Sequence, residues 1–187
     1  MTTISTADFK SGMCIMYNGK MCTIVEFQHV KPGKGGAFVR TKLRDVKTGR
    51  VVDYTFNAGV KFDSVNLETR HLQYLYNDGA DYYFMDTDTY EQTPVPAEVV
   101  GDASKWLKEG DDTSLMYADN ELISLEPKMF VELEVTDTDP GFKGDTATNT
   151  TKPATLETGA VVQVPMFVEI GDTLQIDTRD GHFVKRV

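Results

Sequence analysis

The sequence predicts an all-β protein with three small β-barrel domains in series. Short stretches of alternating apolar and polar residues recur along the chain, and turn signals such as Asn18-Gly19 and Asp180-Gly181 separate them. One segment, residues 103–109, has the composition of a short helix. The breaks between strand-rich stretches place the domains at residues 1–64, 65–127 and 128–187.

The first domain is expected to be an SH3-like barrel. Several short strands joined by hairpin turns within about 60 residues are typical of such barrels. The chain is expected to leave this domain at residues 58–61. The expected strands are residues 13–17, 20–30, 38–45 and 51–57.

The turn at Asn18-Gly19 also bears on the two cysteines. If these two residues form a tight hairpin, Cys22 pairs with Ile15, one position away from Cys14. Successive residues of a strand point to opposite faces, so the two sulfur atoms are expected on opposite faces of the ribbon. This arrangement argues against a disulfide.

The second and third domains are expected to be OB-type barrels. In the second, Pro94 and Pro96 break the strand pattern ahead of the expected helix. In the third, residues 130–137 alternate cleanly, and the polar stretch 139–152 that follows is long enough to be a functional loop. The expected strands are residues 65–76, 82–86, 114–118 and 121–125, then 130–137, 154–158, 161–164, 167–170, 173–177 and 183–187.

The most unusual stretch, residues 31–37, has the sequence KPGKGGA and joins two expected strands. Pro32 disfavours a helix, and the three glycines allow positive φ values, so a hairpin with a long, bare tip is expected. Lys34 is the only residue from Gly33 to Gly36 with a side chain. Glycines on both sides cost loop entropy without any packing in return, so a cation here suits a narrow site on a partner.

The distribution of charge singles out the same domain. The net charge is −10, yet residues 1–64 contain ten Lys/Arg against five Asp/Glu, and residues 65–187 contain nine against twenty-four. A basic domain attracts polyanions at short range even in an acidic protein. We therefore expect Arg40, Lys42 and Arg44 to contact phosphates of a polyanionic partner, although a charged run is often only a solvated face.

The motifs exclude several kinds of chemistry. A phosphate-binding P-loop requires glycine where the chain has Gln28, and Ser or Thr where it has Gly35. The acidic stretches 86–88 and 137–141 lack the remaining ligands of a calcium loop, and the three histidines are scattered. No nucleophile is paired with a base. We expect no catalytic residue, no metal, no cofactor and no enzymatic activity.

Localisation follows from two further observations. The N-terminal residues lack the basic and apolar segments of a signal peptide. No apolar run approaches the roughly 20 residues that a membrane-spanning helix needs. We expect a cytoplasmic protein that does not contact a membrane.

Several longer motifs resemble the bacterial translation elongation factor P family. They are FQHVKPGKGGAFVR at 27–40, YLYNDG at 74–79, FKGDTA at 142–147 and KPATLETG at 152–159, in family order over essentially the whole chain. The resemblance implies an SH3-like (KOW-like) domain followed by two OB folds, in an L-shaped arrangement similar to tRNA. It also implies a monomeric factor that binds both ribosomal subunits next to peptidyl-tRNA and stimulates peptide-bond formation at consecutive prolines.

The resemblance further implies roles for single residues. Lys34 would contact the CCA end of peptidyl-tRNA and be the target of a lysine-modifying enzyme. The tip loop that presents it would comprise Lys31, Pro32, Gly33, Gly35 and Gly36. A loop near the exit-site codon and the small subunit would comprise Gly144, Asp145, Thr146 and Ala147. Phe183 and Arg186 would contact the small subunit, with Phe183 where the family commonly has tyrosine. The phosphates that Arg40, Lys42 and Arg44 contact would be those of tRNA or rRNA.

A second hypothesis stays open, that of a general RNA-binding or RNA-chaperone protein built from OB folds. Such surfaces usually combine aromatic side chains with basic ones. The aromatic run Tyr82-Tyr83-Phe84 lies instead in an acidic domain. The sequence therefore favours the ribosome factor.

Overall fold

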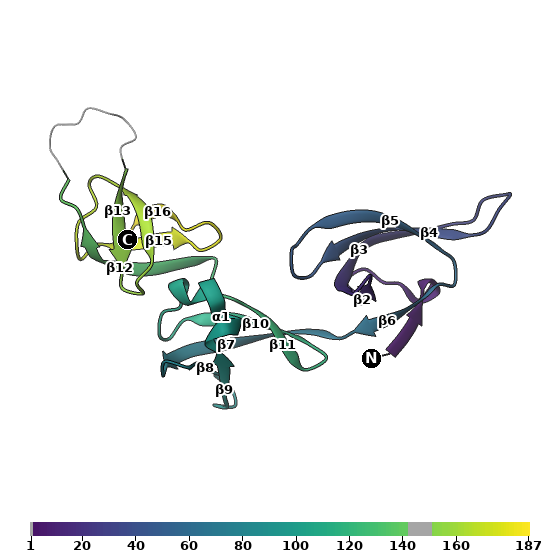
Figure 1. Ribbon diagram of the computed structural model, residues 1–187, viewed down its shortest axis with the longest axis horizontal. Helices are drawn as coiled ribbons and strands as arrows, with labels where there is room; N and C mark the ends of the chain where they lie inside the picture. The colour runs from purple at the N-terminus through teal and green to yellow at the C-terminus, as the bar shows by residue number, and fades with distance from the viewer. Residues whose placement is uncertain (1, 142–150) are drawn as a thin grey trace. The chain divides into compact units, whose positions relative to one another are not determined.

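The computed structural model describes residues 2–141 and 151–187. They form three antiparallel sheets with only short helical segments (Figure 1), so the predicted all-β fold class is confirmed. By its internal contacts the chain divides into two compact units, Met1–Thr69 with Met116–Ser124 and Arg70–Leu115 with Leu125–Val187. The domain boundaries expected after residues 64 and 127 stay a prediction.

The first sheet has six strands in the order β1-β6-β2-β3-β4-β5. The predicted bounds of its three longest strands are confirmed, but the expectation that the chain leaves the domain at residues 58–61 is wrong. Lys61 begins a strand that returns between β1 and β2, and its partners are far away in the sequence. The elements are β1 (Thr2–Ser5), the 3-10 helix η1 (Thr6–Asp8), β2 (Cys14–Tyr17), β3 (Lys20–Val30), β4 (Phe38–Asp45), β5 (Val51–Asn57) and β6 (Lys61–Val65).

The hairpin between β2 and β3 has the predicted register. Asn18 and Gly19 both adopt positive φ, 49° and 73°, as a tight two-residue turn requires. Cys22 pairs with Ile15 and packs with it in one core cluster, whereas Cys14 belongs to another. Both cysteines are free, and burial raises the pKa of the Cys14 thiol to about 11. The thiol is therefore inert at neutral pH.

The second and third sheets share one topology. Their strand orders are β11-β10-β7-β8-β9 and β14-β13-β12-β15-β16, so in each the first strand lies between the second and the fourth. The edge strands β14 and β16 also approach each other, which nearly closes the third sheet into a barrel. The strands are β7 (Leu67–Asn77), β8 (Asp81–Met85), β9 (Gln92–Pro96), β10 (Asp112–Ala118), β11 (Glu121–Glu126), β12 (Phe130–Thr138), β13 (Thr151–Leu156), β14 (Val161–Pro165), β15 (Thr173–Asp177) and β16 (His182–Arg186).

Three predicted features of these sheets are wrong. Pro94 and Pro96 lie within β9, which tolerates them because an edge strand needs fewer backbone donors. The helical turns begin earlier than predicted, as α1 (Ala97–Val100) followed by the 3-10 helix η2 (Gly101–Trp106). Residues 167–170, predicted to be a strand, form a turn between β14 and β15.

The second unit is held together by one tryptophan and several polar contacts. Trp106 packs against the core of the third sheet, and a Cβ atom on Gly181 would lie only 3.2 Å from its ring. Lys108 Nζ lies 2.9 Å from Glu157 Oε1, and Lys128 Nζ lies 2.9 Å from Asp111 Oδ1. None of the helices in the described residues has the length and hydrophobicity of a bilayer span.

Candidate nucleic-acid interface

The predicted hairpin with a bare tip is confirmed. Strands β3 and β4 pair up to Val30 and Phe38, which leaves residues 31–37 beyond the last pair. Every residue from Lys31 to Gly36 is exposed to solvent. The ladder below the tip contains eight residue pairs and carries the tip away from the core of the sheet (Figure 1).

The three glycines of the tip do not play the same role. Gly35 has a φ of +105°, whereas Gly33 and Gly36 do not adopt positive φ. A Cβ atom on Gly33 or Gly36 would meet no other atom within 4 Å. Of the three glycines that allow positive φ, only Gly35 therefore adopts it. The other two leave the sides of Lys34 open.

Lys34 is unengaged within the described residues. No hydrogen bond or ion pair joins its ammonium group to residues 2–141 or 151–187. Its charge is thus available to a partner. The bare backbone beside it keeps steric hindrance to a minimum.

The three basic residues expected to contact phosphates share one face of β4. Arg40, Lys42 and Arg44 are exposed and alternate with buried residues that face the core. This follows from the two-residue period of a strand. A depression of about 360 Å³ lies over the same part of the sheet, lined by Glu26, Phe27, Gln28, Arg40, Thr41, Lys42, Asp53, Tyr54 and Thr55.

The cross-strand neighbours of Lys42 are acidic. Lys42 Nζ lies 3.0 Å from Glu26 Oε2, and Asp53 stands opposite on β5. The hydrogen bond from Lys42 to Glu26, together with the charges of Glu26 and Asp53, raises the pKa of the lysine. Its positive charge is locally compensated.

Arg40 has different neighbours on the same strand. It stands opposite Gln28 and Thr55, which are uncharged, and its Cζ atom lies 5.7 Å from the ring centroid of Phe38. No acidic side chain forms an ion pair with it in the described part of the chain. Arg40 is therefore better placed than Lys42 to donate hydrogen bonds to a phosphate.

The two C-terminal residues singled out by the sequence lie on β16 and are joined through a third residue. The rings of Phe183 and Phe167 meet edge to face with centroids 6.3 Å apart, and Arg186 lies over the ring of Phe167. Phe167 was not predicted as a site residue, because residues 167–170 were interpreted as a strand. The predicted loop residues Gly144, Asp145, Thr146 and Ala147 lie outside the described residues.

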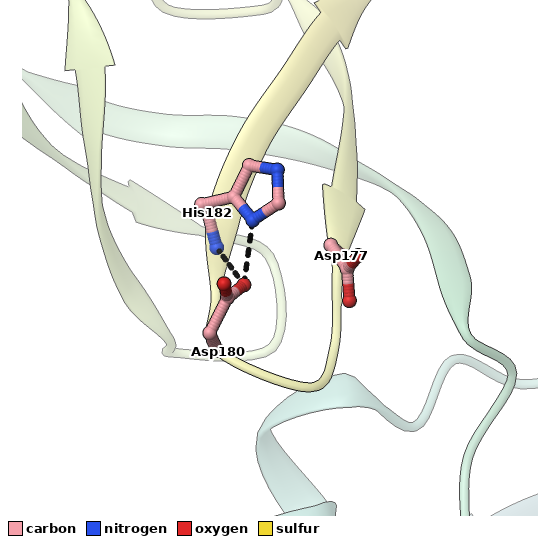
Figure 2. A group of neighbouring side chains, drawn as sticks. All are labelled: Asp177, Asp180 and His182. Atoms are coloured by element: carbon pink, nitrogen blue, oxygen red, sulfur yellow. Dashed lines mark hydrogen bonds and ion pairs between the residues drawn. The ribbon is translucent and has the colours of Figure 1, made fainter.

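The structure also gathers Asp177, Asp180 and His182, whose ligand-type atoms lie within 4.8 Å of one another (Figure 2). Their spacing, D-x-x-D-x-H, was the signal available in the sequence. Asp180 Oδ1 already accepts hydrogen bonds from His182, at 2.6 Å from Nδ1 and 3.2 Å from the backbone nitrogen. These contacts occupy the carboxylate.

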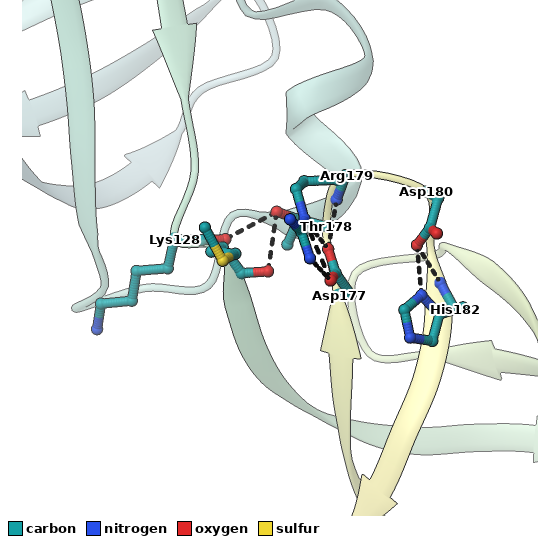
Figure 3. Close-up of polar contacts among 7 residues, drawn as sticks. Lys128, Asp177, Thr178, Arg179, Asp180 and His182 are labelled. Carbon is teal, nitrogen blue, oxygen red and sulfur yellow. Dashed lines mark hydrogen bonds and ion pairs between the residues drawn. The ribbon is translucent and has the colours of Figure 1, made fainter.

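Asp177 is engaged as well (Figure 3). Its carboxylate accepts hydrogen bonds from Nε and Nη2 of Arg179, which hold the pKa of the Asp177 carboxyl at about 2. Thr178 joins the same turn to the segment that precedes β12, since its Oγ1 donates a hydrogen bond to the carbonyl oxygen of Lys128 at 2.8 Å. A guanidinium in contact with the carboxylate opposes a metal cation, so the group is a structural ion-pair network.

Comparison with known proteins identifies the family of the chain. Three family models match the chain: the elongation factor P (EF-P) KOW-like domain at residues 5–62, the elongation factor P (EF-P) OB domain at 67–125, and elongation factor P, C-terminal, at 131–186. The chain is 55% identical over 184 residues to elongation factor P of Pelotomaculum thermopropionicum, covering 98% of this chain and 100% of that one. It is 53% identical over 183 residues to that of Corynebacterium kroppenstedtii, covering 98% of each.

A solved structure is also similar. Eukaryotic translation initiation factor 5A from Methanococcus jannaschii aligns with 67% of this chain and 92% of its own, at 23% identity and a TM-score of 0.48. The family assignment rests on the three family models and the full-length relatives. The chain belongs to the elongation factor P family of translation factors, which are not enzymes.

Proposed function

We propose that the protein binds the ribosome next to peptidyl-tRNA and relieves stalling at consecutive prolines by positioning the CCA end with its Lys34 tip. Membership of the elongation factor P family makes it a translation factor that acts with the ribosome. The single observation that carries the finer proposal is the tip itself. An unengaged cation stands on an exposed hairpin between glycines that leave space at its sides.

This arrangement suits positioning rather than catalysis. Peptide-bond formation requires the two reactive ends to be aligned, and alignment can account for roughly 7–11 kcal/mol of a barrier. Proline is a rigid and poor participant, so its reaction gains from a well-held donor. A lysine that reaches the CCA end supplies such a hold without acting as acid, base or nucleophile.

The basic face of β4, formed by Arg40, Lys42 and Arg44, is proposed to bind the RNA backbone. Arg40 and Arg44 point outward from β4 and lack acidic neighbours across the sheet, so they fit phosphates of tRNA or rRNA. Lys42 retains a weaker role because Glu26 already neutralises it. In the second unit, Phe183 and Arg186 are proposed to contact the small subunit.

Lys34 is also the proposed acceptor of a covalent extension by a lysine-modifying enzyme. An extension would lengthen the reach of a side chain that nothing in the described residues restrains. The mass of the protein purified from its own cells, followed by mapping of the tip peptide, tests this part.

The central experiment measures relief of stalling on a reporter with consecutive prolines. Lys34→Ala is expected to abolish relief while leaving the melting temperature unchanged, because the side chain makes no contact that stabilises the fold. Lys47→Ala provides the matched control, since Lys47 is an exposed lysine in the turn between β4 and β5. Full relief by Lys34→Ala would refute the proposed role of the tip.

The alternative of a general RNA-binding protein has one observation in its favour. Tyr76 and Tyr83 stack with centroids 4.6 Å apart and an angle of 14° between their rings. However, Asp78 Oδ2 accepts a hydrogen bond from the Tyr83 hydroxyl at 3.0 Å, and this carboxylate repels phosphate. Equal affinity for arbitrary single-stranded RNA and for ribosomes would favour this alternative.

A further inference from the structure

The seam where β14 approaches β16 contains an aromatic side chain to which no role has been given. Phe167 lies in the turn that follows β14, and 57% of its surface is exposed. The next residue, Val168, is completely buried and supplies the packing of this turn. The ring of Phe167 is therefore not needed to fill the core.

A guanidinium accompanies this ring. The Cζ atom of Arg186 lies 5.6 Å from the ring centroid of Phe167, within the range of a cation–π contact. The edge-to-face contact with Phe183, at an angle of 74°, supports the ring from a second direction. The exposed ring is thus held between a cation and a second aromatic residue.

Asp172 fixes the guanidinium and the turn together. Its Oδ2 atom accepts hydrogen bonds from Arg186 Nη1 at 3.3 Å and from the backbone N–H of Glu169 at 2.9 Å. The Glu169 N–H and the Arg186 charge hold the pKa of the Asp172 carboxyl below its ordinary value, so it stays ionised at neutral pH.

The turn is also tied to the sheet by its backbone. The N–H of Gly171 donates to the carbonyl of Val135 at 2.9 Å, and the N–H of Val135 donates to the carbonyl of Asp172 at 2.9 Å. Phe167 is thereby presented on a rigid segment. An aromatic ring that is already oriented loses little conformational entropy when a ligand stacks on it.

We infer that Phe167, with Arg186 beside it, is a stacking platform for an unpaired nucleobase of ribosomal RNA. Planar bases stack on aromatic rings and on guanidinium groups, and proteins commonly read unpaired RNA bases in this way. The cation favours an RNA ligand over an apolar peptide. The stacked tyrosines of β7 and β8 have a carboxylate instead of a guanidinium beside them, so Phe167 is the better candidate.

This inference rests on the proposed function, and it adds Phe167 to the contacts expected of Phe183 and Arg186. The test is the affinity of the intact protein for ribosomes. Phe167→Ala is expected to weaken binding roughly five- to a hundredfold, as loss of a stacked base does. Phe167→Tyr is expected to keep the affinity of the unchanged protein.

Ile170→Ala is the matched control, because Ile170 is an equally exposed apolar residue of the same turn, at 62%. Its affinity is expected to equal that of the unchanged protein. Melting temperatures of the three variants verify that each is folded. Equal binding by Phe167→Ala and Ile170→Ala, or equal weakening by Phe167→Ala and Phe167→Tyr, overturns the inference.

Ultraviolet crosslinking of the native protein–ribosome complex identifies the base. A crosslink from the Phe167 peptide to a nucleotide of ribosomal RNA, absent in Phe167→Ala, supports the inference. A crosslink to messenger RNA or to a ribosomal protein, or none above the Phe167→Ala background, overturns it. The Lys34→Ala reporter assay is independent, so loss of stall relief there with normal binding by Phe167→Ala refutes only the stacking platform.

Discussion

Lys34 and Phe167 are both exposed side chains on turns, yet the structure treats them in opposite ways. The tip around Lys34 contains three glycines, and the lysine contacts no described residue through a hydrogen bond or ion pair. The turn around Phe167 is hydrogen-bonded to β12, and the carboxylate of Asp172 ties it to Arg186. One side chain is left loose, and the other is held.

The difference fits the interaction that is proposed for each side chain. A charge attracts phosphate over several ångströms and in many orientations, so a lysine benefits from reach more than from a fixed position. A stacked base needs a ring in one plane at one distance, so the entropy of orienting that ring is best removed in advance. An unrestrained lysine such as Lys34 and a fixed aromatic ring such as Phe167 are thus suited to two different kinds of contact with RNA.

The largest effect is expected from disturbing the rigid turn. A Cβ atom on Gly141 would lie 2.5 Å from the carbonyl oxygen of Met166, the residue before Phe167. Backbone must move to admit it, so Gly141→Ala is expected to destabilise the protein by about 1–3 kcal/mol. Urea denaturation followed by the fluorescence of Trp106, the single tryptophan, measures this because Trp106 packs on the same sheet.

Gly36→Ala is the control for that change, because a Cβ atom there would meet nothing within 4 Å. Calorimetry is expected to find it no less stable than the unchanged protein, and up to about 1 kcal/mol more stable because alanine makes the unfolded chain less flexible. If Gly141→Ala were as stable as Gly36→Ala, the turn would not be rigid, and the contrast between the two regions would fail.

The sequence was sufficient to predict the hairpin that carries Lys34, but not the turn that contains Phe167. The bounds of β3 and β4, and hence the hairpin, follow from alternation and from the glycines between them, which are local signals. β6 was missed because it is defined by pairing with β1 and β2. Residues 167–170 look like a strand because Phe167, Val168 and Ile170 are apolar, and only the fold shows which of them is buried.

The same limit applies to charge. Counting basic residues on β4 gives Arg40, Lys42 and Arg44 equal weight as phosphate contacts. The register places Glu26 and Asp53 on either side of Lys42, and nothing local to β4 reveals this. A residue's usefulness to a ligand depends on its cross-strand neighbours, which sequence spacing alone does not fix.

An intermediate effect is expected on the salt dependence of tRNA binding when the basic residues of β4 are changed. A plot of log affinity for tRNA against log salt concentration has a negative slope. Arg40→Gln is expected to make that slope less steep by about 0.9, the value for one lost phosphate contact. The double variant Glu26→Gln with Lys42→Gln removes a neutral pair, so its slope is expected to stay unchanged. Fluorescence anisotropy over a series of salt concentrations measures both slopes. An equal decrease in the double variant would mean that Lys42 contacts phosphate despite Glu26.

The smallest effect on stability is expected at Gly33. Comparing Gly33 with Gly35 distinguishes a glycine that leaves open space from one that the backbone conformation requires. Gly33 does not adopt positive φ and has open space around it, so Gly33→Ala is expected to raise stability by about 0.4–1 kcal/mol through a less flexible unfolded chain. Gly35→Ala is expected to lower stability, because its φ of +105° is strained for alanine. Stall relief then gives the functional result: if Gly33→Ala folds better but relieves stalling less, the open sides of Lys34 serve the partner. Undiminished relief would instead show that the narrow tip is dispensable and that only the lysine matters.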